Sequence, residues 1–111
     1  MAVYIAAEAD PKLAERLWGL IERLREDPKS VPRKEVVDVI VDLTKASFDY
    51  HFVSPLDDLG VGFTTKTTIQ VSLASMMKIL RGVVQKVVGS MSEQGYGKLA
   101  DYLERAYFEL E

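Results

Sequence analysis

The chain has 111 residues, of which 48% are hydrophobic and 28% charged, and its formal net charge is −3; this is the composition of one globular domain and excludes a disordered chain. It contains no cysteine, which excludes a disulfide framework, a thiol nucleophile and cysteine-ligated zinc or iron–sulfur sites. The acidic balance disfavours nucleic-acid binding, and no basic leader or apolar run of ~20 residues points to export or a membrane span. We therefore expect a single cytoplasmic domain over residues 1–111 that binds neither nucleic acid nor membranes.

The amino-terminal part predicts a short arm and then a helix. The apolar run 2–7 fits a docking strand, an extra helical turn or a swapped arm equally well. The first helix is predicted from Asp10 to about Glu26, because Asp10 suits the N-cap and Pro11 suits the first helical position. Its leucines recur at three- and four-residue steps, so one face is expected in the core.

The second helix is predicted from about residues 30–32 to Phe52. Its charged residues form a narrow stripe, and the rest of its girth is largely apolar: the stripe is Glu35, Asp38, Asp42, Lys45 and Asp49. A helix that is apolar over most of its girth is buried on more than one side. Carboxylates at these spacings can bind divalent metals, but a solvated or salt-bridged stripe is the simpler reading, and we expect no metal site.

Residues 54–63 predict a connection, and the longest helix is predicted from about Thr64 to Ser90. A heptad-like seam of apolar residues is expected to be its buried face: Ile69, Leu73, Met76, Leu80, Val83 and Val87. Between residues 61 and 91 there are four basic residues and no acidic one. This basic helix is therefore expected to pair with its acidic neighbours.

Residues 92–97 break the pattern, and the fourth helix is predicted from about Lys98 to Leu110. Its expected buried residues are Leu99, Tyr102, Leu103, Ala106 and Leu110. Four amphipathic helices with short links most simply pack as an antiparallel four-helix bundle, here with a short amino-terminal arm.

The segment GVGFTTKT, from Gly60 to Thr67, is a partial match to the phosphate-binding pattern G-x-x-x-x-G-K-[ST]. Thr65 replaces the second glycine and no buried strand precedes the segment, so nucleotide hydrolysis is not expected. An anion site at the helix start, formed by Thr65, Lys66 and Thr67, is a hypothesis that survives. The alternative is that Thr64 or Thr65 simply caps the helix.

His51 is the only histidine, and on the second helix it falls in line with Thr44 and Ser47. Three polar groups within an apolar face predict a polar pocket, in which His51 could act as a general base or contact a ligand. A lone histidine cannot form a multi-histidine metal site, and we expect no cofactor. The alternative is a core or boundary histidine that is hydrogen-bonded to a neighbouring helix.

Ser75, Gly82 and Gly89 recur every seven residues on the long helix, opposite its seam and near Val71. Glycine inside a helix costs ~1 kcal/mol relative to alanine, so a stripe of small residues indicates close approach by another backbone. We expect homodimerisation through this stripe. The alternative is a monomer in which the amino-terminal arm or the 54–63 connection covers it.

Three aromatic residues, Trp18, Tyr107 and Phe108, lie at or beyond the edges of the predicted apolar faces and form a candidate binding patch. No catalytic set is recognisable. We therefore expect a non-enzymatic protein–protein interaction module that forms a dimer or binds a protein partner. The alternatives are a small-ligand-binding regulatory bundle, with its ligand near His51 or at residues 64–68, and an enzyme subunit with a site completed across a dimer.

Overall fold

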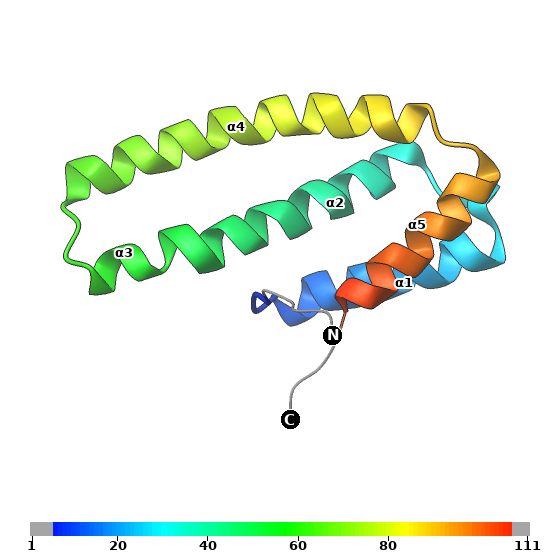
Figure 1. The fold of residues 1–111 in the computed structure, drawn as a ribbon, viewed down its shortest axis with the longest axis horizontal. Coiled ribbons are helices and arrows are strands. Elements are labelled where there is room, and N and C mark those ends of the chain that lie inside the picture. Colours follow the sequence, from blue (N-terminus) through cyan, green and yellow to red (C-terminus); the bar gives the residue numbers. More distant parts are fainter. Residues whose placement is uncertain (1–5, 108–111) are drawn as a thin grey trace, which may run out of the picture.

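The computed structural model describes residues 6–107, and every regular element among them is helical (Figure 1). The long helices are α1 (Pro11–Glu26), α2 (Arg33–Phe48), α4 (Phe63–Gly89) and α5 (Glu93–Ala106), and a short helix α3 spans Pro55–Asp58. A 3-10 turn (Pro28–Ser30) links α1 to α2, and a π-helical segment (Asp49–Val53) joins α2 to α3. The predicted all-helical class is therefore confirmed for the described residues.

Helix α1 begins and ends where the sequence predicts. The carboxylate of Asp10 accepts a hydrogen bond from the Lys12 amide at 2.8 Å, and Pro11 occupies the first position. The apolar face of α1 is the one that enters the core, through Leu13, Leu17, Leu20, Ile21 and Leu24. Arg16 contacts Asp42 of α2 at 2.9 Å, and α5 covers another side of α1.

Helices α2 and α4 form an antiparallel hairpin. Arg81 Nη1 lies 2.5 Å from Asp38 Oδ1, and Lys66 pairs with Asp57 near the other end of the hairpin. These two pairs bear out part of the expected attraction between the basic helix and its acidic neighbours. The two remaining lysines of α4 form no ion pair with a described residue.

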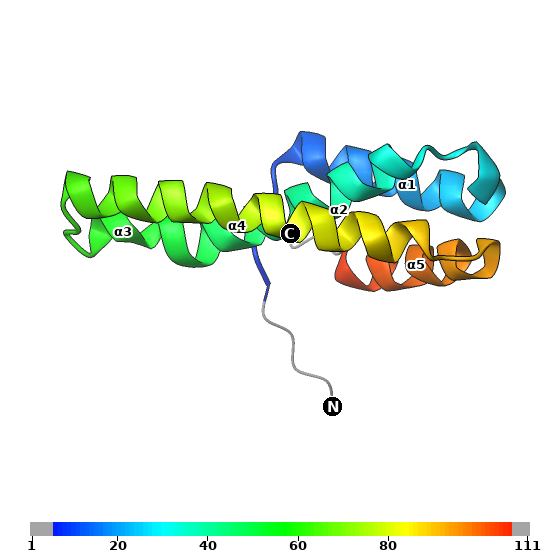
Figure 2. The same ribbon diagram turned by 90° about the horizontal axis from the view of Figure 1, so that it is seen from above.

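The core lies where α1, α2 and α5 meet the carboxyl-terminal end of α4. Figures 1 and 2 show α4 on one side of α2, with α1 and α5 on the other. The most deeply buried side chains come from three helices: Leu20, Ile21, Leu24, Val36, Val39 and Val88. The Tyr96 hydroxyl donates to the carbonyl of Val88 at 3.3 Å and so ties α5 to α4.

The other end of the hairpin projects beyond α1 and α5 (Figures 1 and 2). We call this projection, residues 48–76, the arm. In both views no other helix of the described residues lies beside the arm. Gly60 closes its tip with φ +71°, a left-handed conformation that glycine adopts without strain.

Two predicted boundaries are wrong. The 54–63 connection contains helix α3, and the break expected at residues 92–97 is the first turn of α5. The turn is helical because Ser92 Oγ accepts a hydrogen bond from the Gly95 amide at 3.2 Å and caps the helix. The predicted end of the second helix at Phe52 falls inside the π-helical segment, where the Ser54 amide bonds to the Asp49 carbonyl at 2.8 Å.

The predicted buried faces of the last two long helices are partly wrong. Because its steps average about 3.8 residues against the 3.6 of an α-helix, the row of α4 that packs on α2 turns gradually around the helix and leaves the predicted seam; its half-buried or buried members are Ile69, Leu73, Met77, Leu80, Val84 and Val88. Met76, Val83 and Val87 are exposed instead. On α5, Leu103 is buried as predicted, but Tyr102 is 67% exposed and Ala106 is also exposed.

Some predictions concern the ends of the chain. Residues 6–10 have no regular secondary structure and are exposed. Residues 1–5 of the predicted amino-terminal segment lie outside the described residues, as do Phe108 and Leu110. Within residues 6–107 the helices are all too short or too polar to cross a membrane.

Candidate interaction surface and adjoining hollow

A row of exposed apolar side chains runs along α4. Met76, Ile79, Val83 and Val87 are 48%, 71%, 54% and 57% exposed, and we call them the outer row. At 1.5 Å per residue the row is roughly 16 Å long. The sequence predicted burial for three of its members and did not single out Ile79; the broad apolar girth of the helix was the signal that could have revealed a second apolar row.

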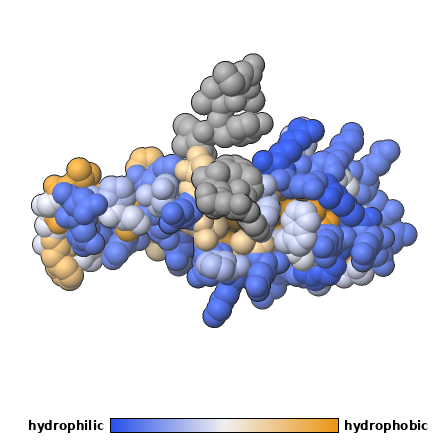
Figure 3. Space-filling view, turned by 90° about the horizontal axis from the view of Figure 1, so that it is seen from below, coloured by the Kyte–Doolittle hydropathy of each residue, from blue (hydrophilic) through white to orange (hydrophobic). Residues whose placement is uncertain are grey.

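The outer row lies on one flank of the hairpin. At about 100° per residue, Ile79 and Val83 lie about 160° around α4 from Arg81, which faces Asp38 on the other flank. Two more large apolar side chains belong to the arm near its tip, Phe52 at 62% and Leu59 at 72% exposure. Figure 3 shows apolar residues at the tip and edge of the arm, whereas the α1–α5 end is mostly hydrophilic.

The outer row and the two tip residues expose apolar area at two places, since the exposed Thr68 and Ser72 of α4 lie between them. At about 200 Å² for a fully exposed large apolar residue, their six exposed fractions amount to roughly 700 Å², of which roughly 460 Å² belongs to the outer row. The largest apolar patch of a typical monomer is about 300–600 Å² and is often functional. The outer row by itself is a patch of this size.

The small-residue stripe predicted on α4 lies next to the outer row, on the side turned away from α2. Val71 is exposed, as is Ser75. A Cβ atom built on Gly82 meets nothing within 4 Å, and one on Gly89 meets only Arg33 Nη1 at 3.8 Å. Among the described residues, neither the 54–63 connection nor residues 6–10 cover Gly82, so that alternative is wrong for the described part of the chain.

The acidic stripe of α2 is held by arginines. Arg23 Nη1 donates to Glu35 Oε2 at 2.9 Å, and this hydrogen bond holds the pKa of Glu35 below its usual range. The hydrogen bond from Arg81 lowers the pKa of Asp38 in the same way. No group of three or more metal-ligating side chains gathers within residues 6–107. The stripe therefore joins helices.

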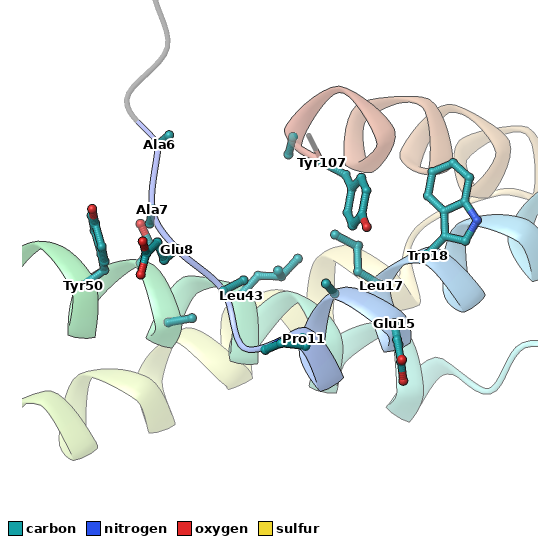
Figure 4. A pocket seen from close by; sticks show the side chains of 15 residues that line it. Ala6, Ala7, Glu8, Pro11, Glu15, Leu17, Trp18, Leu43, Tyr50 and Tyr107 are labelled. Atoms are coloured by element: carbon teal, nitrogen blue, oxygen red, sulfur yellow. The ribbon is translucent and has the colours of Figure 1, made fainter. Parts of the chain in front are cut away.

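A hollow of about 860 Å³ lies beneath α2, between the segment 6–9, the start of α1 and the end of α5. Figure 4 shows Tyr50 and Glu8 at one side of it and Tyr107 with Trp18 at the other, with Leu43 between them. The Trp18 and Tyr107 rings lie 5.4 Å apart at 42°. The sequence singled out Trp18 and Tyr107 as aromatic candidates but missed Tyr50 and Glu8, because only the fold brings these segments together.

The predicted polar pocket is only partly assembled. Ser47 lines the hollow. The His51 ring stands edge-on to Tyr50, with centroids 5.1 Å apart at 86°, so it adjoins the hollow through that tyrosine. Thr44 does not line the hollow, and its hydroxyl donates to the Ile40 carbonyl at 2.9 Å. His51 makes no hydrogen bond to another described residue, whereas the alternative of a structural histidine expects one to a neighbouring helix.

The predicted anion site has partners within the chain. Lys66 pairs with Asp57, and the Thr67 hydroxyl donates to the Phe63 carbonyl at 3.0 Å. Thr65 is exposed, and Gly62, not a threonine, is the N-cap of α4. These contacts stabilise the start of a helix, and they place a carboxylate beside the lysine that an anion would need.

Comparisons with protein-family models, with curated proteins and with solved structures found no match. Two features of the described residues bear on function. The first is the exposed apolar area of α4 and the arm, and the second is the hollow beneath α2.

Proposed function

We propose that the protein is a cytoplasmic, non-enzymatic interaction module that forms a homodimer through the outer row of α4 and the tip of the arm. The observation that carries this proposal is the apolar area of roughly 700 Å² that the outer row and the two tip residues expose together. A standard interface buries about 800 Å² per partner, of which about 60% is apolar, or roughly 500 Å². The surface is therefore sufficient for a stable dimer.

The same surface supports an antiparallel four-helix bundle built from two copies. Val84 packs toward α2, and Val83 in the outer row is about 100° around α4 from it. A helix in a four-helix bundle has its two neighbours at about this angle. Two α2–α4 hairpins packed flank to flank complete such a bundle, with the stripe of Val71, Ser75, Gly82 and Gly89 along its edge.

The test is the solution mass over a concentration series, by light scattering or sedimentation. We expect a mass that approaches twice 12.5 kDa for the natural chain, and a monomer for Val83→Glu, because a buried unpaired carboxylate opposes association. Gln85→Glu is the matched control, since Gln85 is exposed about 160° around α4 from Val83. A natural chain that stays at 12.5 kDa throughout refutes the proposal.

A second candidate function, binding of a small ligand in the hollow beneath α2, is supported by one observation. The volume of about 860 Å³ falls within the ~300–1,000 Å³ of ligand sites. Ser47 and Tyr50 offer hydroxyls to it, and His51 adjoins it. A fragment screen by NMR should find compounds that shift the amides of Ser47 and Tyr50; a screen without such shifts rejects this function.

A further inference from the structure

The side chains around the hollow differ in charge from the chain as a whole. Glu8 and Glu15 line it, and among its described lining residues there is no lysine, arginine or histidine. An adjoining hollow of about 380 Å³ shares Glu8 and adds Asp10 and Asp49, again without a basic residue in its described lining. The chain as a whole carries 14 basic against 17 acidic residues, so the charge around the hollow is more one-sided than that of the chain.

Aromatic rings form much of the remaining wall. Trp18, Tyr50 and Tyr107 line the hollow, with Leu17 and Leu43 as apolar neighbours (Figure 4). The face of an aromatic ring carries negative charge density and attracts cations within about 6 Å. The rings and the carboxylates therefore favour the same sign of charge, and the aliphatic residues favour an apolar body.

The start of α1 does not oppose this preference. Pro11 lines the hollow and has no amide hydrogen, and the amide of Lys12 already donates to Asp10. The helix start therefore offers little to an anion. A neutral apolar ligand could contact Leu17 and Leu43, but it would gain no electrostatic attraction from the carboxylate of Glu8.

We propose that the hollow beneath α2 binds an organic cation with an apolar body, whose charged group lies near Glu8 and the ring of Tyr50, which Figure 4 shows at the same side of the hollow. The apolar body lies along Leu17 and Leu43. This inference rests on the second candidate function and names the chemical class of its ligand. It does not depend on dimerisation.

The experiment compares three probes with the same tail and different head groups: hexyltrimethylammonium, hexanol and hexyl sulfate. Trp18 is the only tryptophan and lines the hollow, so its fluorescence reports binding there. We expect saturable quenching by the cation with a Kd roughly two- to fivefold below that of hexanol, the size of an exposed cation–π contribution. Hexyl sulfate should bind more weakly than hexanol.

Variants then test the carboxylates. Glu8→Gln should remove the preference for the cation over hexanol and leave hexanol binding unchanged. Glu22→Gln is the matched control, because Glu22 is an exposed glutamate of α1 that does not line the hollow. Equal binding of cation and hexanol, or an unchanged preference in Glu8→Gln, overturns the cation inference alone. Failure of all three probes to bind near Trp18 overturns it together with the ligand-binding function.

Discussion

Replacing Ile79 with alanine tests the proposed dimer at its most exposed outer-row residue. Ile79 is 71% exposed within one chain. Full burial of an isoleucine side chain contributes about 1.5–3 kcal/mol, so covering this exposed fraction contributes about 1–2 kcal/mol per protomer. A symmetric dimer loses the contribution twice, about 2–4 kcal/mol in all. The dissociation constant should therefore rise about 30- to 700-fold.

The stability of the single chain should hardly change, because alanine at an exposed helical position has a slightly better helix propensity than isoleucine. The assay is sedimentation equilibrium across a concentration series, with circular dichroism to confirm that helicity is retained. Lys78→Ala is the matched control, since Lys78 is also exposed on α4 but about 100° around it. An unchanged dissociation constant for Ile79→Ala, or an equal rise for Lys78→Ala, refutes the assignment of the interface to the outer row.

Three further predictions concern the fold. The pKa values of Asp38 and Glu35 are lowered in the folded state. The stability that these two carboxylates contribute is therefore present above about pH 4 and is lost as the pH falls through their folded pKa values. Asp38→Asn should reduce the fall in unfolding free energy that is measured as the pH is lowered. Gly82→Ala should raise the unfolding free energy of the monomer by up to about 1 kcal/mol, because alanine favours a helix more than glycine does and the new Cβ meets nothing within 4 Å. A lower unfolding free energy would contradict the open environment of Gly82. Leu24 is fully buried, so Leu24→Ala should cost about 2–5 kcal/mol in denaturant unfolding, whereas Leu59→Ala at the exposed tip should cost far less.

The helices themselves were predictable because each has a local signal. Asp10 and Pro11 mark the start of α1, and the periodicity of α2 and α4 identifies them as helices despite their many β-branched residues. The start of α5 was missed because Gly95 and Gly97 argue against a helix, whereas the hydrogen bond from the Gly95 amide to Ser92 Oγ and the packing of α5 on α1 favour one.

The faces that meet were harder to predict. Val83 and Val84 lie about 100° apart around α4 and both are valines, so the sequence alone does not decide which of the two packs on α2. The hollow could not be predicted, since Glu8, Ser47 and Tyr107 come from three distant parts of the sequence. Ser47 and His51 were singled out as polar residues on an apolar face, and only Ser47 reaches the hollow itself.

Helix α4 runs unbroken from Phe63 to Gly89, from the tip of the arm to the core. Its two ends therefore share one backbone but have different environments: Val88 is buried, whereas Phe63 is fully at the surface. Local opening of a helix is opposed by the packing around it, so amide hydrogen exchange should be slowest near Val88 and quicken steadily toward Phe63. Dimerisation through the outer row and the tip of the arm would slow exchange toward Phe63 and flatten that gradient. The exchange profile of this one helix would then report the fraction of the protein that is dimeric.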